Sequence, residues 1–244
     1  SAAASENSYW QYELAIKKME SDLHSVVGGD GAIYAIRKEL YEKLDEKDIN
    51  DFVNPLQIIA KGYRGIFEPE AICLEETAGD FKKEARRKER IVNRSFRGLM
   101  KVNEVLNPFK YGIFSFEVIS HKLLRWLVPV FLLGIAIGSI ILSYFDQRLF
   151  QLLYVLETLF LWLAIIGYHK QNKATISPLF FYPYYFLMVN YYSLIGIIKA
   201  MTGKIQVTWS SPREHREDNG LSLYEKLTSA FLFITPVIIF YDFI

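Results

Sequence analysis

The chain is poor in the residues that build disulfide and metal sites. Its 244 residues include one cysteine and four histidines, and the histidines lie too far apart to match a metal-ligand pattern. A disulfide framework and a cysteine-based metal site are therefore excluded. The net charge of +1 excludes the strong basic field of a typical nucleic-acid-binding protein. We expect Cys73, which lies in an apolar run, to be a small buried hydrophobic residue in a reducing compartment.

Apolar segments dominate the second half of the chain. Charged residues crowd into residues 1–126, whereas residues 127–200 consist largely of Leu, Ile, Phe and Tyr. A membrane span needs about 20 apolar residues, and three stretches reach or approach that length: 127–144, 149–168 and 227–244. We therefore expect a multi-pass protein of the plasma membrane whose charged part is cytoplasmic.

Two further segments favour positions at the membrane surface. Residues 106–126 place apolar side chains opposite charged ones, as in an amphipathic helix in the headgroup plane. Residues 176–199 contain two prolines and have Lys and Arg on both sides, which favours an interfacial or re-entrant segment, with a span as the alternative. Glu157 lies within an expected span, so it either lines a channel or is a protonated or hydrogen-bonded packing residue.

The charged part is expected to combine helices with short strands. Residues 8–23 place Tyr9, Tyr12, Ile16, Met19 and Leu23 at steps of three and four, which predicts a helix with an aromatic-rich inner face. Turn and strand patterns follow it. They predict a glycine-rich turn at 28–31, a buried strand at 32–36, a short helix at 37–44, and strands at 64–69 and 71–76.

Acidic residues begin the next expected helix. Asp48, Asn50 and Asp51 precede an apolar run that Gly62 ends. Such residues suit a helix N-terminus, where side-chain oxygens meet free backbone amides. On spacing alone, two interpretations stay open: the acids only cap the helix, or one of them is a functional carboxylate.

A basic stripe marks the helix expected from residue 80 to about 100. At ~100° per residue its basic side chains fall on one narrow face, opposite an apolar face. The stripe consists of Lys83, Arg87, Arg90, Arg94 and Arg97. It is either a solvated face, a surface for anionic lipid, or a site whose guanidinium groups bind a diphosphate.

The order of these motifs resembles a known group of enzymes. SYWQYE, GGDGAIYAIRKEL, DINDF, KGYRGIFEPEA and RRKERIVNRSFRGL are similar in order and spacing to the C-terminal half of membrane-embedded family 2 glycosyltransferases. That family includes the synthases of hyaluronan, chitin, cellulose and bacterial exopolysaccharides. The resemblance implies that residues 1–105 are the acceptor-side part of an α/β, GT-A-type catalytic domain. An interfacial helix (106–126) and a helical membrane domain (127–244) would follow.

The resemblance also implies a catalytic base. In the family an acidic pair opens a helix, and its second member takes the proton from the acceptor. Asn50 and Asp51 occupy that place, so Asp51 is the candidate base. Because Asn50 departs from the acidic pattern, Asp48 stays open as the alternative.

A second implied element binds the leaving diphosphate and the acceptor. The family's Gln-x-x-Arg-Trp motif aligns with residues 87–91. Arg90 keeps the family's arginine, whereas Arg87 replaces Gln and Ile91 replaces Trp.

Two loops complete the implied site. The segment that lines the acceptor channel in the family matches Gly29, Asp30 and Gly31. Residues 203–216 resemble the loop that closes over bound nucleotide, with three matching residues: Thr208, Trp209 and Arg213.

The donor side of such a site is not recognisable in this chain. In the family an upstream Asp-x-Asp motif holds the metal and the sugar nucleotide, and no Asp-x-Asp occurs here. We therefore expect Mg²⁺ or Mn²⁺ to be bound by an upstream catalytic half, with no metal ligands in this chain. The chain would then be either truncated or one piece of a split enzyme.

The expected activity is an inverting glycosyl transfer from a nucleotide-sugar to a growing polysaccharide, and a UDP-sugar is the expected donor. A carboxylate such as Asp51 serves as general base for the acceptor hydroxyl, and cationic side chains stabilise the departing diphosphate. Two alternatives stay open. The protein transfers a single sugar to a lipid carrier, or it is a noncatalytic membrane scaffold.

Overall fold

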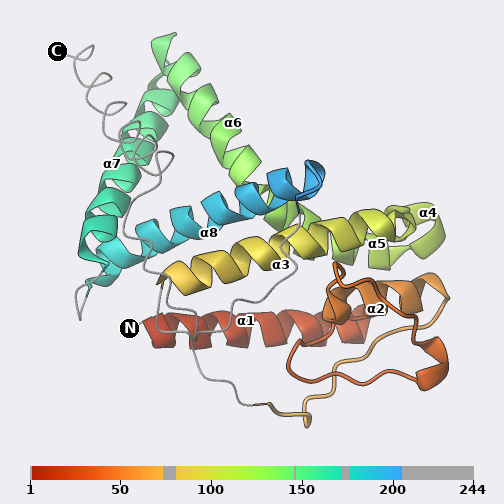
Figure 1. The fold of residues 1–244 in the computed structure, drawn as a ribbon. Helices are drawn as coiled ribbons and strands as arrows, with labels where there is room; N and C mark the ends of the chain where they lie inside the picture. The colour runs from red at the N-terminus through yellow and green to blue at the C-terminus, as the bar shows by residue number, and fades with distance from the viewer. Residues whose placement is uncertain (1, 74–80, 146, 172–175, 205–244) are drawn as a thin grey trace.

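The computed structural model is all-helical in the part of the chain that it describes, residues 2–73, 81–145, 147–171 and 176–204 (Figure 1). The described residues up to position 101 form the helices α1 (Ala2–Leu23), α2 (Asn50–Ala60) and α3 (Phe81–Lys101), and the short 3₁₀ turn η1 (Lys38–Leu40). The interfacial region contains η2 (Asn103–Leu106), α4 (Pro108–Tyr111), α5 (Ile113–Val118) and the π-helical turn η3 (Ile119–Leu123). Three long apolar helices follow: α6 (Leu124–Tyr144), α7 (Arg148–Lys170) and α8 (Pro178–Met201).

The expected α/β fold is wrong, because the described residues contain no strand. The runs at 32–36 and 64–69, and the described part of the third run, are irregular. A strand is stable only when a neighbouring strand pairs with its backbone, and here serine side chains bind two amides of the 64–69 run instead. Ser25 Oγ accepts the amide of Gly65 at 2.9 Å, and Ser21 Oγ accepts that of Phe67 at 2.8 Å.

Two smaller expectations about this region are also wrong. The helix expected at 37–44 is only the single 3₁₀ turn η1. Cys73, expected to be buried, is exposed, because residues 71–73 are irregular and are not packed against the core.

Helix α1 is present as expected, but it buries a different face. Tyr12, Met19 and Leu23 are 57%, 61% and 62% exposed, whereas Glu13 and Glu20 are buried. Periodicity identifies an apolar face but not the surface that covers it, and the surface against α1 is polar. The buried carboxylates are tolerated because they are hydrogen-bonded.

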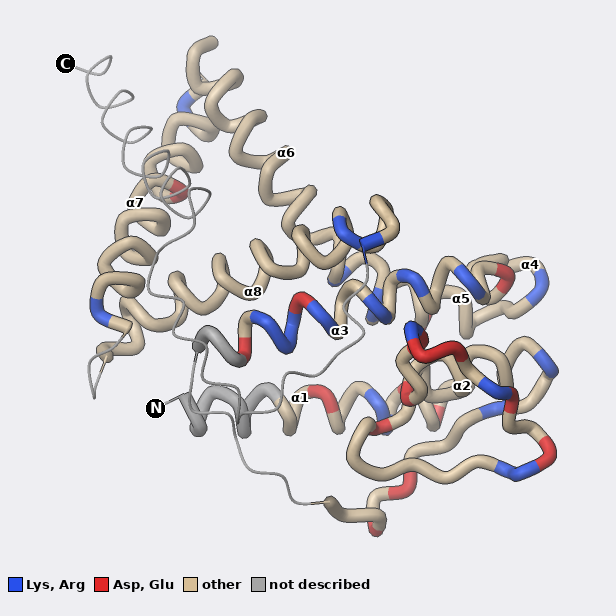
Figure 2. The backbone as a smooth tube through the Cα atoms, in the orientation of Figure 1, with Lys and Arg blue, Asp and Glu red and all other residues tan. Residues whose placement is uncertain are grey.

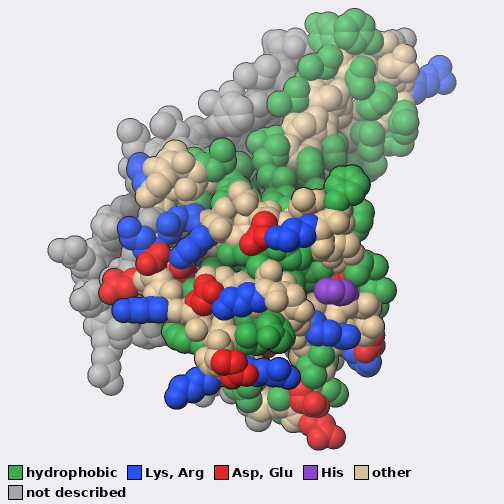
Figure 3. Space-filling model, turned by 90° about the vertical axis from the view of Figure 1, so that its right-hand side faces the viewer, with side chains coloured by type: hydrophobic (Ala, Val, Ile, Leu, Met, Phe, Trp, Pro, Cys, Tyr) green, Lys and Arg blue, Asp and Glu red, His purple; other side chains and the backbone are tan. Residues whose placement is uncertain are grey.

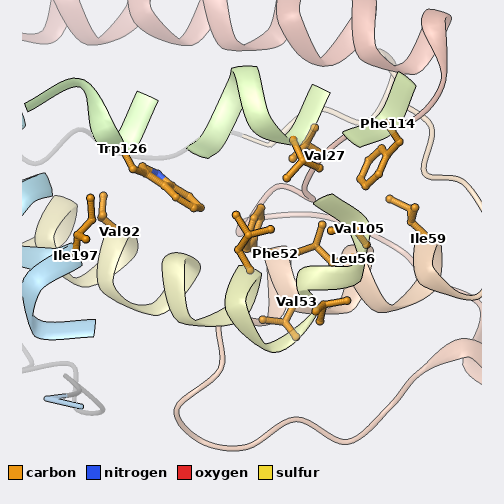
Figure 4. Close-up of a cluster of buried hydrophobic side chains, with 13 residues drawn as sticks. Val27, Phe52, Val53, Leu56, Ile59, Val92, Val105, Phe114, Trp126 and Ile197 are labelled. Atoms are coloured by element: carbon orange, nitrogen blue, oxygen red, sulfur yellow. The ribbon is translucent and has the colours of Figure 1, made fainter. Parts of the chain in front are cut away.

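The hydrophobic core joins the charged part of the chain to the first apolar helix (Figure 4). The α2 side chains Phe52 and Leu56 lie at its centre, and the Trp126 ring of α6 packs edge-on against Phe52, with ring centroids 5.7 Å apart. The expected end of α2 is confirmed: Gly62 adopts φ 87°, a conformation that favours glycine. The Trp126 side chain is part of this hydrophobic core.

Helix α3 buries the apolar face that its sequence predicts, and α8 lies along it (Figure 1). At their crossing Asn93 Nδ2 donates to Gly196 O at 3.2 Å, and Lys199 pairs with Glu89 at 2.5 Å. Gly196 permits this approach, since a Cβ there would lie 2.8 Å from the carbonyl oxygen of Glu89. The interfacial alternative for residues 176–199 fits this contact, and their position in a bilayer stays a prediction.

Among the residues that the structure describes, two helical stretches are long and apolar enough to cross a membrane, Ile113–Tyr144 and Arg148–Lys170. Charged residues are sparse on α6, α7 and α8 and frequent on the elements below them (Figure 2). The space-filling view shows the same division between a hydrophobic upper part and a charged lower part (Figure 3). The segment expected to span at 227–244 lies outside the described residues.

The interfacial region differs from the single amphipathic helix expected at 106–126. It is divided into four short elements, with Gly112 at φ 57° between α4 and α5. Glu117 and His121, expected on the water-facing side, are buried, whereas Ile113 and Phe116 are exposed. The polar side of this region therefore faces the protein.

We predict that Gly196→Ala destabilises the protein by about 1–3 kcal/mol, because the new methyl group would overpack the crossing of α3 and α8. Gly134→Ala is the matched control, since nothing lies within 4 Å of its Cβ position. That substitution should be neutral or stabilise by up to about 1 kcal/mol through helix propensity. Thermal unfolding in one detergent compares the two, and equal melting temperatures would contradict the packing assigned to Gly196.

Candidate functional site

Asp51 lies in the first turn of α2 and has an unusual environment. Its Oδ1 is buried and has no hydrogen-bond partner among the described residues. Burial raises the pKa of Asp51, and the charge of Asp30 raises it further. A hydrogen bond with the residue's own backbone and the charges of Lys122 and Lys17 act in the opposite direction. An unpaired buried carboxylate oxygen with a shifted pKa is a feature of functional sites.

The backbone of Asp51 holds the glycine turn in place. The amide of Gly29 donates to the carbonyl oxygen of Asp51 at 2.7 Å. This carbonyl is free because its partner in a regular helix would be the amide four residues on, and that residue is Pro55. The turn approaches closely: a Cβ on Gly31 would lie 2.9 Å from Asp51 Oδ2.

Lys17 of α1 binds the same turn from the other side. Its Nζ lies 3.5 Å from Asp30 Oδ2 and donates to the carbonyl oxygen of Gly29 at 3.5 Å. The structure thus brings together Asp51, the predicted acceptor segment Gly29–Gly31, and a lysine that the sequence analysis did not select. The signal for Lys17 was its place in a charged stripe with Glu13 and Glu20, at steps of four and three.

Asp48, the alternative base, has a structural environment instead. Its carboxylate pairs with Lys101 at 2.6 Å, and this hydrogen bond raises the pKa of Lys101. Arg94 binds the same loop, donating to the backbone carbonyls of residues 46, 47 and 48. Asp48 and Arg94 therefore fix the loop that leads into α2, whereas Oδ1 of Asp51 has no hydrogen-bond partner among the described residues.

Arg90 of the basic stripe on α3 lies within electrostatic range of Arg87 and Arg94. Burial lowers the pKa of Arg90, and so do the charges of Arg94 and Arg87, while the charge of Asp51 raises it. Arg87 lies 3.5 Å from Glu84. No hydrogen bond or ion pair joins Arg90 to another described residue. Its guanidinium is therefore available to an anion, whose charge would relieve the repulsion within the stripe.

A buried charge network connects α1 to the interfacial region. The imidazole of His121 contacts Glu20 and Glu13, and Arg125 pairs with Glu13. Burial alone would raise the pKa of Glu13, but hydrogen bonds from His121 and Arg125 and the charge of Lys122 hold it below its usual value. His121 therefore has a structural role in the network.

The remaining predicted site residues are Glu157 of α7 and three residues of the loop at 203–216. Glu157 accepts a hydrogen bond from Ser139 Oγ at 2.6 Å, which agrees with the alternative of a hydrogen-bonded packing residue; a channel beside it stays a prediction. Three predicted residues lie outside the described part of the chain: Thr208, Trp209 and Arg213.

The described residues do not fit a metal site. No group of three or more His, Cys, Asp or Glu side chains that could hold a metal ion occurs among them. We therefore assign no metal ligand in this part of the chain and derive no chemical step through a metal.

Comparison with known proteins adds no family assignment. No family model, curated protein or solved structure matches the chain.

We predict opposite effects of two isosteric substitutions on stability. Asp48→Asn should destabilise by about 1–3 kcal/mol, because it removes a charged partner of Lys101. Asp51→Asn should stabilise the protein at neutral pH. Because the pKa of Asp51 is raised on folding, the folded state binds its proton more tightly, and the ionised carboxylate lowers stability above that pKa.

Thermal unfolding of both variants between pH 4 and pH 8 measures this difference. The stabilisation by Asp51→Asn should shrink as the pH falls and Asp51 becomes protonated. Destabilisation by Asp51→Asn at pH 8 would contradict the environment assigned to this carboxylate.

Proposed function

We propose that this chain provides the acceptor side of an inverting membrane glycosyltransferase, which moves a sugar from a UDP-sugar to a growing polysaccharide. The observation that carries the proposal is the environment of Asp51. Its Oδ1 is buried and has no hydrogen-bond partner in the described part of the chain, while the neighbouring Asp48 pairs with Lys101. A general base must be close to its substrate and free of a permanent partner.

Asp51 acts as the base in this proposal. The acceptor hydroxyl attacks the anomeric carbon, its proton passes to the Asp51 carboxylate, and the bond from that carbon to the nucleoside diphosphate breaks. Burial supports this role, because a carboxylate with a raised pKa accepts a proton more readily than one in water. One in-line displacement inverts the configuration of the sugar.

Arg90, with Arg87 beside it, stabilises the leaving group. A departing diphosphate gains negative charge, and guanidinium groups offer a fixed fork of donors that matches phosphate oxygens. Arg90 supports this role because it has no ion-pair partner among the described residues and lies in electrostatic range of Asp51. The donor sugar, together with Mg²⁺ or Mn²⁺, is proposed to bind mainly to an upstream catalytic half.

The membrane setting supports polymer synthesis at the cytoplasmic face of the plasma membrane. The core that contains Phe52 of α2 also contains Trp126 at the start of the first candidate span, so the site is fixed close to the apolar helices. Residues 203–216 are proposed to close over the nucleotide.

The decisive experiment compares Asp51→Asn with Asp22→Asn in the full-length gene product, reconstituted in proteoliposomes. UDP-glucose, UDP-N-acetylglucosamine and UDP-glucuronic acid are supplied separately with Mg²⁺ or Mn²⁺. We expect Asp51→Asn to lower transfer by about 10²–10⁴-fold while UDP binding is retained. Asp22 is exposed and pairs with Lys18, so its variant should keep wild-type turnover.

Product analysis separates the alternatives. Product that stays water-soluble and lengthens with time supports a polysaccharide synthase, whereas a single radiolabelled sugar in the lipid extract indicates a lipid carrier. Normal turnover in Asp51→Asn would overturn the assignment of the base. Absence of transfer from every donor by the wild-type protein would favour a noncatalytic scaffold.

A separate prediction concerns the arginine stripe. Arg90→Ala should weaken inhibition by UDP by about tenfold, because a charge-assisted hydrogen bond to the diphosphate is lost. Arg86→Ala on the same helix is the control, since Arg86 is exposed. Inhibition constants from initial rates provide the comparison, and equal values for the two variants would assign the stripe to general surface charge.

A further inference from the structure

Both backbone polar groups of Gly29, in the glycine turn, are hydrogen-bonded. The amide of Gly29 donates to Asp51 O at 2.7 Å, and the carbonyl of Gly29 accepts from Lys17 Nζ at 3.5 Å. Lys17 also pairs with Asp30, the next residue of the turn, at 3.5 Å. The turn is therefore fixed between α1 on one side and the start of α2 on the other.

The position of Lys17 is itself well determined. Its side chain is only 12% exposed, and Glu13 and Glu20 of the same helix are buried on either side of it in sequence. Glu20 accepts the amide of Val27 at 3.2 Å, directly before the turn. A lysine on such an anchored face keeps its ammonium group in a defined place, unlike a lysine on an exposed face.

We propose that Lys17 is a positioning residue for the acceptor: it holds the Gly28–Gly31 turn against Asp51, so that the acceptor hydroxyl meets the carboxylate in a fixed geometry. This inference rests on the proposed function of Asp51 as the base. Lys17 acts through the turn and through its charge.

The geometry explains why a lysine is needed here. The turn carries three glycines, at positions 28, 29 and 31, and glycine loses more conformational freedom on folding than any other residue. The Gly29–Asp51 hydrogen bond restrains the peptide before Gly29, and the contact of Lys17 with the Gly29 carbonyl restrains the peptide after it. A small displacement of the turn would move the acceptor away from Asp51, and misplacements of about 1 Å lower rates severely.

Lys17 also affects the protonation of the base. The charged groups that act on Asp51 come from four elements: Lys17 from α1, Asp30 from the turn, Lys122 from η3 and Arg90 from α3. Removing the positive charge of Lys17 would raise the pKa of Asp51. The acidic limb of the pH–rate profile, below which Asp51 is protonated and inactive, should then move to higher pH.

The test compares three substitutions in the full-length protein: Lys17→Met, Lys17→Arg and Lys18→Met. Methionine keeps most of the apolar stem, arginine keeps the charge, and Lys18 is an exposed lysine of the same helix that pairs with Asp22 at 2.7 Å. The probe is the UDP-sugar of the three above that gives the highest turnover, with the matching free monosaccharide as acceptor.

We expect Lys17→Met to raise the acceptor KM by about tenfold and to move the acidic limb upward, with the KM for the UDP-sugar unchanged. Lys17→Arg should restore most of both properties, and Lys18→Met should behave as wild type. A purely structural defect would instead lower the amount of active enzyme, and so would reduce turnover without changing the acceptor KM or the pH profile. That result would overturn the proposal.

A readout independent of turnover separates this inference from the proposed function. Hydrogen–deuterium exchange of a peptide covering residues 25–34 reports the protection of the Gly29 amide. Faster exchange in Lys17→Met than in Lys18→Met supports the positioning role even if Asp51→Asn stays active, in which case only the assignment of the base falls. Unchanged exchange and acceptor KM, with Asp51→Asn inactive, would overturn the role of Lys17 and leave the proposed function standing.

Discussion

The candidate site depends on one backbone hydrogen bond, from the amide of Gly29 to the carbonyl of Asp51. In a regular helix that carbonyl would accept from the amide four residues on, but Pro55 has no amide hydrogen. The proline thus leaves an acceptor unused inside the first turn of α2, and the glycine turn binds it at 2.7 Å. A residue that weakens a helix in most contexts here connects two segments that are more than twenty positions apart. The same contact places the Asp51 carboxylate beside Gly31, where a Cβ would lie 2.9 Å from Oδ2.

A second constraint comes from the charged stripe of α1. Glu13, Lys17 and Glu20 are directed into the protein, where each has polar partners: His121 and Arg125 for the first carboxylate, the turn for Lys17, and His121 with the Val27 amide for Glu20. Buried charges are stable only when they are paired in this way. These three side chains of α1 therefore fix the distance between the interfacial region and the glycine turn. The site is held from the side of η3 and α6 as well as from α2.

The sequence was sufficient for elements whose stability is local. The end of α2 at Gly62 and the buried apolar face of α3 follow from turn chemistry and periodicity, and both are present. The strands were mispredicted because a strand depends on a neighbour that periodicity does not reveal. The face of α1 was mispredicted for a related reason: Tyr12, Met19 and Leu23 form an apolar face, but the surface against the helix is polar. The choice between Asp48 and Asp51 required the folded structure, because Lys101 is distant from Asp48 in the sequence and pairs with it only in the fold.

The relation between Asp51 and Arg90 is informative because the two charges act on each other without an ion pair. In direct contact, each would satisfy the other, and breaking that contact would be costly for any substrate. Their separation leaves a carboxylate oxygen and a guanidinium both available, within a region that burial has partly removed from water. Proton abstraction and leaving-group stabilisation require opposite charges, and each charge must act on a different atom of the reacting groups. Lys101 and the loop carbonyls occupy Asp48 and Arg94, and so prevent these nearby residues from neutralising the pair. The structural role of those two residues is therefore a condition for the chemistry that we propose for Asp51 and Arg90.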